Sequence, residues 1–194
     1  EGRCLMGPET VPEALTEALA KGTLESILVV GQGTASIAAM AVGEFLKRSL
    51  SGTRIRVEAT KASELSGFRL RGDMSRALVI AVTQSGATAD TNRAVDLARE
   101  RGAITLAIVN RRNSDITFKT DGVIYTSDGR DVEMSVASTK AFYSQVVAGA
   151  VLGLSFGEIA GSLSREEVRA ELADLRRLPG LLEEVLARRE EIER

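Results

Sequence analysis

The sequence predicts an α/β protein whose strands form a parallel sheet. Short apolar runs alternate with helical patterns along most of the chain, which is typical of successive βαβ units with right-handed crossovers. The 194 residues are enough for one domain with a proper core. The 44% hydrophobic and 27% charged fractions are those of an ordinary soluble protein. We therefore expect one α/β domain.

Strands are expected where short apolar runs are bounded by glycine or polar residues. Five such runs lie at residues 26–30, 54–59, 77–82, 104–109 and 122–126. The second run alternates polar and apolar residues, so we expect it to be more exposed than the first.

Helices are expected where apolar residues recur at helical spacing. These segments lie at residues 12–20, 37–50, from after residue 88 to Gly102, and 138–154, with a brief helical turn at 62–65 that Gly67 ends and a polar loop at 110–115 that can cap a short helix. The segment at 138–154 is apolar around much of its surface, which is typical of a helix buried in its own domain or against a partner.

The pattern divides the chain into three parts. Residues 1–22 form a lead-in with a short helix, residues 23–160 the α/β domain, and residues 161–194 charged amphipathic helices or a connector. In the last part Pro179 and Gly180 are expected to break the helix. This part is either a solvated charged face over one packed stripe or a connector to a missing domain. Because the chain starts at Glu1 and not at Met, we expect a processed or excised piece.

Composition excludes several classes of partner and chemistry. The net charge of -2 and the lack of a basic block argue against nucleic-acid binding. No apolar run of about 18 residues and no signal peptide stand out, so we expect neither membrane insertion nor secretion. The single Cys4 fits a cytoplasmic protein without a disulfide framework. The chain has no His, so the commonest acid–base chemistry and His-ligated metal sites are excluded within it.

A binding site is expected where the strands end. In open α/β sheets, ligands lie outside the carboxyl ends of the strands at the topological switch point. The first loop at this edge, residues 31–36, partly matches the dinucleotide fingerprint, but Ser36 replaces its third glycine. The loop is therefore either a weak dinucleotide site or a tight glycine turn without a ligand.

The loop after the third strand has the composition of a phosphate site. Its sequence, residues 83–91, is Thr-Gln-Ser-Gly-Ala-Thr-Ala-Asp-Thr. Thr83, Ser85 and Thr88 can each donate one hydrogen bond, Gln84 can donate two, and Gly86 lets the backbone turn. An anion here would also meet the positive end of the following helix. The alternative is that Ser85 and Thr88 only cap that helix.

A third loop, residues 136–142, enters the long apolar helix. Ser138 can cap this helix, whereas a cation at Lys140 opposes the helix dipole. Sites often break such local rules, so Lys140 is a candidate functional residue.

These three loops resemble those of the sugar isomerase (SIS) domain family. Their order and spacing are most similar to the first SIS repeat in the isomerase half of the glutamine–fructose-6-phosphate aminotransferase (glucosamine-6-phosphate synthase) family, over about residues 23–156. The resemblance implies a three-layer α/β/α sandwich on a five-stranded, flavodoxin-like parallel sheet. It also implies a homodimer, and a second SIS repeat and a glutaminase domain beyond this chain.

The resemblance implies a role for individual residues. Thr83, Gln84, Ser85, Gly86 and Thr88 would hold the phosphate of a sugar. The residues that would contact the sugar itself are Gly33, Thr34, Glu133, Val136, Ser138 and Lys140. Gln32, Ala35 and Ala87 depart from the family pattern, and Ala35 removes a hydroxyl that could recognise the sugar.

The expected function is the binding of a hexose 6-phosphate such as fructose 6-phosphate or glucosamine 6-phosphate. The family's catalytic Glu, His and Lys belong to the second repeat and the tail, so the resemblance implies no catalytic residue here. We expect no cofactor, no metal ion and little isomerase activity from this chain alone. One alternative function is that of a regulatory module that senses a sugar phosphate. A second and less favoured alternative is that of a dinucleotide-binding domain.

Overall fold

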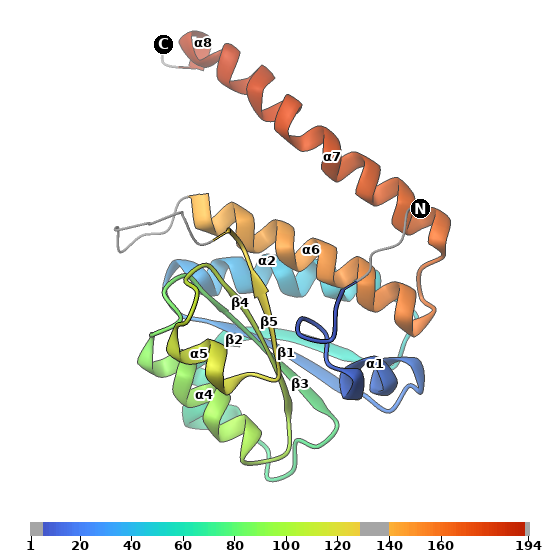
Figure 1. Cartoon of the computed structure of the whole chain (residues 1–194), viewed down its shortest axis with the longest axis vertical. Helices are drawn as coiled ribbons and strands as arrows, with labels where there is room; N and C mark the ends of the chain where they lie inside the picture. The colour runs from blue at the N-terminus through green and yellow to red at the C-terminus, as the bar shows by residue number, and fades with distance from the viewer. Residues whose placement is uncertain (1–5, 129–139, 193–194) are drawn as a thin grey trace.

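The computed structural model describes residues 6–128 and 140–192, and these form an α/β/α sandwich (Figure 1). Within this part of the chain the sheet has five strands in the order β2-β1-β3-β4-β5, and every neighbouring pair is parallel. The predicted fold class is therefore confirmed. The strands are β1 (Ser26–Gly31), β2 (Arg56–Lys61), β3 (Ala77–Thr83), β4 (Ile104–Val109) and β5 (Gly122–Tyr125).

The strand order determines where the chain crosses the sheet. β1 lies between β2 and β3, so the chain leaves β1 in one direction and returns on its other side. The crevice between the ends of β1 and β3 is the switch point of this topology. β3 is buried along its whole length, whereas β2 at the sheet edge is mostly half-buried or exposed, as its alternating sequence predicts.

Helices cover both faces of the sheet. The first face carries α1 (Glu13–Ala20), α2 (Thr34–Ser49) and α6 (Lys140–Ala160). The other carries α3 (Ala62–Glu64), the π-helical turn η1 (Leu65–Arg69), α4 (Ala89–Arg99) and α5 (Asp115–Lys119). The chain ends with α7 (Arg165–Ala187) and α8 (Arg189–Ile192).

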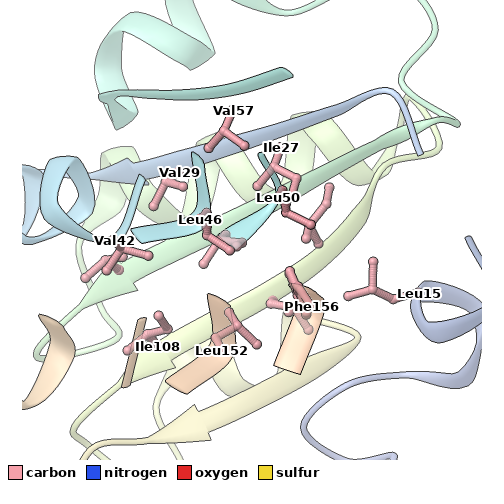
Figure 2. Packing of buried hydrophobic residues seen from close by; sticks show 14 of the residues in the cluster. Leu15, Ile27, Val29, Val42, Leu46, Leu50, Val57, Ile108, Leu152 and Phe156 are labelled. Atoms are coloured by element: carbon pink, nitrogen blue, oxygen red, sulfur yellow. The ribbon is translucent and has the colours of Figure 1, made fainter. Parts of the chain in front are cut away.

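The larger core lies between the sheet and the layer of α2 and α6. In Figure 2, Leu46 of α2 and Leu152 and Phe156 of α6 meet Ile108 of β4 and Val29 of β1. All five side chains have no exposed surface. Burying an aliphatic or aromatic side chain of this size contributes about 1.5–3 kcal/mol. This packing holds both helices against the sheet.

Glycines let α6 approach α2 closely. A methyl group at Gly149 would lie 2.3 Å from a side-chain carbon of Val42, and one at Gly153 would lie 3.0 Å from Ser49 Oγ. The two helices run in the same direction, because residues further along α6 meet residues further along α2. Both helices therefore begin at the carboxyl edge of the sheet.

α6 is also a core helix of unusual apolarity. By length and composition alone it could cross a membrane, since its most apolar window of 18 residues has a mean hydropathy of 1.3. Half of that window is buried inside the fold. The packing against α2 and the sheet accounts for this composition, because the core helix of a globular protein meets the same criterion.

Two predicted breaks are wrong. Gly67 does not end the turn after β2, because the chain continues through it as η1 to Arg69. Pro179 lies inside α7, which is continuous from residue 165 to 187. The proline removes one hydrogen bond to the carbonyl of Leu175. This part of α7 is largely exposed, so water can solvate that carbonyl and the helix persists.

α7 leaves the body of the domain. Its first turn is fixed by a capping box between Ser164 and Glu167, and Val168 is fully buried. Beyond these turns the helix projects away from the α2/α6 layer (Figure 1). Leu182, Val185 and Leu186 near its end are 55%, 56% and 66% exposed.

Candidate functional site

The site lies at the carboxyl edge of the sheet, where β1 and β3 end side by side. Val30 of β1 pairs with Ala81 of β3, so the loops that follow the two strands meet at the switch point. We call residues 31–34 the β1 loop and residues 83–88 the β3 loop. α2 begins at the end of the first loop and α4 at the end of the second.

A cavity of about 240 Å³ lies between the two loops. It is lined by residues of β3, of both loops and of the first turns of α2 and α4: Gln32, Gly33, Thr34, Ala35, Val82, Thr83, Gln84, Ser85, Thr88 and Thr91. Pockets for drug-sized ligands are typically about 300–1,000 Å³. The cavity therefore suits a small polar ligand better than a dinucleotide.

In the β3 loop, two backbone N–H groups donate hydrogen bonds to the oxygens of two side-chain hydroxyls. The N–H of Gly86 donates to Thr83 Oγ1 at 3.2 Å, and the N–H of Ala87 donates to Ser85 Oγ at 3.3 Å. Each hydroxyl oxygen thus accepts a bond within the loop and keeps its own proton for another acceptor. Hydroxyls held in this way are suited to donate to an anion.

Thr88 is not a side-chain cap, although it occupies the N-cap position of α4. Its backbone is extended, and its side chain makes no capping hydrogen bond. Ser85 bonds to Ala87, before the first residue of the helix. The interpretation that these two residues only cap α4 is therefore not supported.

The turn of the β3 loop requires glycine. Gly86 has a φ of 64°, and a methyl group there would lie 2.0 Å from Ser114 Oγ. Its carbonyl accepts hydrogen bonds from the N–H of Ile116 at 3.0 Å and from Asn92 Nδ2 at 3.3 Å. The N–H of Arg111 also donates to the carbonyl of Gln84 at 3.1 Å. The segment after β4 therefore fixes the loop from behind.

The β1 loop is shaped by close backbone packing. A methyl group at Gly31 would lie 2.4 Å from the carbonyl oxygen of Ala35, so only glycine lets β1 end this close to α2. Gly33 follows with a φ of 59°, and Ser36 Oγ donates to its carbonyl at 2.7 Å. Ser36, which replaces the third glycine of a dinucleotide fingerprint, thus stabilises the turn.

The structure brings most of the predicted site residues together. Six line the cavity: Gly33, Thr34, Thr83, Gln84, Ser85 and Thr88. Gly86 forms the turn behind it, and Lys140 is the exposed first residue of α6. Glu133, Val136 and Ser138 lie outside the described residues.

Sequence reasoning missed Val82 and Thr91, and it treated Gln32 and Ala35 only as departures from a pattern. Gln32 Oε1 lies 3.5 Å from Ser63 Oγ, which donates to it from the segment after β2. Thr91 is the last residue of the loop at 83–91, and the sequence gives it no role in binding. Its spacing of three residues from Thr88 places the two on neighbouring turns of one helix face, which is the clue that could have located it.

The lining of the cavity carries no ionisable side chain among the described residues. Its electrostatic character comes from hydroxyls, amides and the first turns of α2 and α4, whose helix dipoles are positive at this end. Among the described residues, no group of three or more His, Cys, Asp or Glu side chains could hold a metal ion. The result is a cavity at the switch point of a parallel sheet whose described lining is polar and uncharged.

Comparison with known proteins identifies the class. Residues 24–155 match the SIS domain family, so the chain belongs to that family. It is 38% identical over 168 residues to a glutamine–fructose-6-phosphate aminotransferase of Thermus thermophilus. It is 36% identical over 183 residues to the corresponding enzyme of Corynebacterium diphtheriae. These alignments cover 86% and 93% of this chain but only 26% and 28% of the relatives.

Solved structures with a similar fold include a domain of these aminotransferases. The C-terminal domain of glucosamine-fructose-6-phosphate aminotransferase from Francisella tularensis has a TM-score of 0.80 at 25% identity, over 97% of this chain and 52% of that one. A protein of Escherichia coli, solved as a complex with a small molecule, has the same fold, with a TM-score of 0.62 at 16% identity over 84% of each chain. This chain is thus an SIS domain that resembles part of the aminotransferases.

Proposed function

We propose that this chain binds a sugar phosphate of the hexose 6-phosphate class in the cavity between the β1 and β3 loops. The observation that carries the proposal is the hydrogen bonding of the β3-loop hydroxyls. Thr83 and Ser85 already accept backbone hydrogen bonds, and the Thr88 side chain does not cap α4. Three hydroxyl protons are thus available to the three strongly accepting oxygens of a phosphate.

The phosphate would lie in the β3 loop, against the first turn of α4. Helix N-termini bind phosphate because backbone N–H groups and the dipole both favour negative charge. The sugar would extend toward Gly33 and Thr34 of the β1 loop, with Gln84 at the rim. Ala35 offers no hydroxyl at this wall, so we expect it to relax the recognition of the sugar.

The chain would bind the substrate without completing an isomerisation. Moving a proton between carbons requires a positioned acid or base. The described cavity lining offers only hydroxyls, amides and apolar groups, and the sequence contains no His. We expect this chain to hold the phosphate while residues of another segment or domain supply the chemistry.

Calorimetric titration tests the binding proposal. Wild-type protein titrated with fructose 6-phosphate, glucosamine 6-phosphate and inorganic phosphate should bind both sugar phosphates more tightly than phosphate alone. Ser85→Ala should weaken all three, and Thr117→Ala is a matched control because this hydroxyl donates to the carbonyl of Ser114, away from the cavity lining. Equal affinity of the wild type and Ser85→Ala would contradict the proposal.

We also propose that the chain forms a homodimer through the outer surface of the α2/α6 layer. Ile37 and Met40 on α2 are each 56% exposed, and Tyr143 on α6 is 71% exposed. Ile37 and Met40 are three residues apart and therefore share one face of α2. An apolar face that is left exposed is typical of a surface covered by a partner when its side chains form one patch. Light scattering should give a dimer that Met40→Lys dissociates, and a monomer at all concentrations would contradict this proposal.

A further inference from the structure

Thr91 carries a buried hydroxyl to which the proposed function assigns no role. The residue lies in the first turn of α4, is 1% exposed and lines the cavity. Its Oγ1 atom is buried and has no hydrogen-bond partner in the structure. Buried hydroxyls are rarely unpaired in folded proteins, because leaving one unpaired is destabilising.

One ordinary partner of such a hydroxyl is already occupied, and the hydroxyl does not bond to the other, the carbonyl of Ala87, because Thr91 Oγ1 has no partner within the fold. A threonine in a helix commonly donates to a carbonyl three or four residues earlier. Three residues before Thr91 is Thr88, and its carbonyl accepts both the N–H of Asn92 at 3.0 Å and Asn92 Nδ2 at 3.2 Å. These two bonds use the two lone pairs of that oxygen.

The depth of Thr91 indicates which part of a ligand it would meet. Thr83, at 3% exposed, and Thr91, at 1%, are the most deeply buried hydroxyls of the cavity, whereas Thr34, Ser85 and Thr88 are half-buried. Thr83 and Thr91 thus form the floor of the cavity. The group that reaches the floor beside the first turn of α4 is the phosphate, because the helix dipole favours the anion there.

We propose that Thr91 is a fourth hydroxyl donor to the phosphate, and that ligand binding supplies its missing acceptor. The inference rests on the proposed function and deepens it, since it assigns the floor of the site to the phosphate and not to the sugar. A hydrogen bond that is absent without the ligand and formed with it contributes its whole strength to affinity. A donor used within the fold would have to exchange partners.

The test compares Thr91→Val, which keeps the shape and removes the hydroxyl, with Thr91→Ser, which keeps the hydroxyl. Because Thr91→Val removes a hydrogen bond to a charged group, it should weaken the binding of fructose 6-phosphate and of inorganic phosphate alike by roughly 10- to 100-fold. Thr91→Ser should stay within a few-fold of the wild type. Without ligand, the Tm of Thr91→Val should equal or exceed that of the wild type, because a buried unpaired hydroxyl is removed.

Three results would overturn the assignment. Unchanged affinity of Thr91→Val, with Ser85→Ala still weakened, would refute the role of Thr91 and leave the proposed function standing. A loss for fructose 6-phosphate without a loss for inorganic phosphate would place the hydroxyl on the sugar. Failure of the wild type to bind either ligand would overturn the proposed function and this inference together.

Discussion

The β1 and β3 loops occupy equivalent places at the sheet edge but are built differently. Each follows a buried strand and leads into a helix that starts at the cavity. The β1 loop is determined by glycines, and it offers the hydroxyl of Thr34 to the cavity. The β3 loop carries Thr83, Ser85 and Thr88, and it is fixed by bonds from the segment after β4. This difference is the basis for our proposal that the β3 loop holds the phosphate, while the β1 loop shapes the space beside it.

The largest effect is expected from Gly86→Ala. The new methyl group would lie 2.0 Å from Ser114 Oγ, and the φ of 64° disfavours any side chain. The turn must therefore move, and with it the hydroxyls on either side. Binding of fructose 6-phosphate should fall below detection by calorimetry, with a lower Tm.

Gly33→Ala in the β1 loop is the matched comparison. Its φ of 59° also disfavours a side chain, but a methyl group there has no atom within 4 Å. Strain of this kind costs about 1–3 kcal/mol. Stability should fall, while affinity for inorganic phosphate stays close to that of the wild type. Loss of phosphate binding in Gly33→Ala but not in Gly86→Ala would reverse the assignment of the two loops.

The pH dependence of binding should come from the ligand. Among the described residues the cavity lining has no ionisable side chain, whereas a phosphate monoester loses its second proton with a pKa of about 6. The dianion is favoured above this pH, so affinity for fructose 6-phosphate should fall up to about tenfold between pH 7 and pH 5. Sulfate, which stays a dianion over this range, should bind with a flat profile. A parallel loss for sulfate would indicate a titrating group of the protein.

Thr34→Val should have the smallest effect. Thr34 is the hydroxyl that the β1 loop presents to the cavity, and a hydrogen bond to a neutral sugar hydroxyl is worth about 0.5–1.5 kcal/mol. Affinity for fructose 6-phosphate should fall by a few-fold to about tenfold, and affinity for inorganic phosphate should not change. Equal losses for the two ligands would place Thr34 on the phosphate.

The sequence was sufficient to predict the sheet and most of the residues that line the cavity, because both depend on local patterns. Apolar runs located all five strands among the described residues, and the hydroxyls after β3 follow directly from one of them. Thr91 could not be recognised in this way. Its significance depends on Asn92 occupying the carbonyl of Thr88, and that arrangement is visible only in three dimensions.

The two errors about helix ends have the same origin. Gly67 and Pro179 are helix breakers by local propensity, yet η1 and α7 continue through them. Intrinsic propensity is a weak prior that the surroundings override. The sequence also did not predict the burial of Gln145 on α6. Its side chain is fully buried, and neither the nitrogen nor the oxygen of its amide is hydrogen-bonded.

The most direct test of the central claim is a calorimetric comparison of fructose 6-phosphate with unphosphorylated fructose. If the β3 loop holds the phosphate, the wild-type chain should bind fructose 6-phosphate and show no measurable heat with fructose at the same concentrations. Ser85→Ala should bind fructose 6-phosphate more weakly than the wild type does, so that its titration resembles the one with fructose. Binding of both sugars with the same affinity would contradict the account, because the recognised group would then be the sugar and not the phosphate.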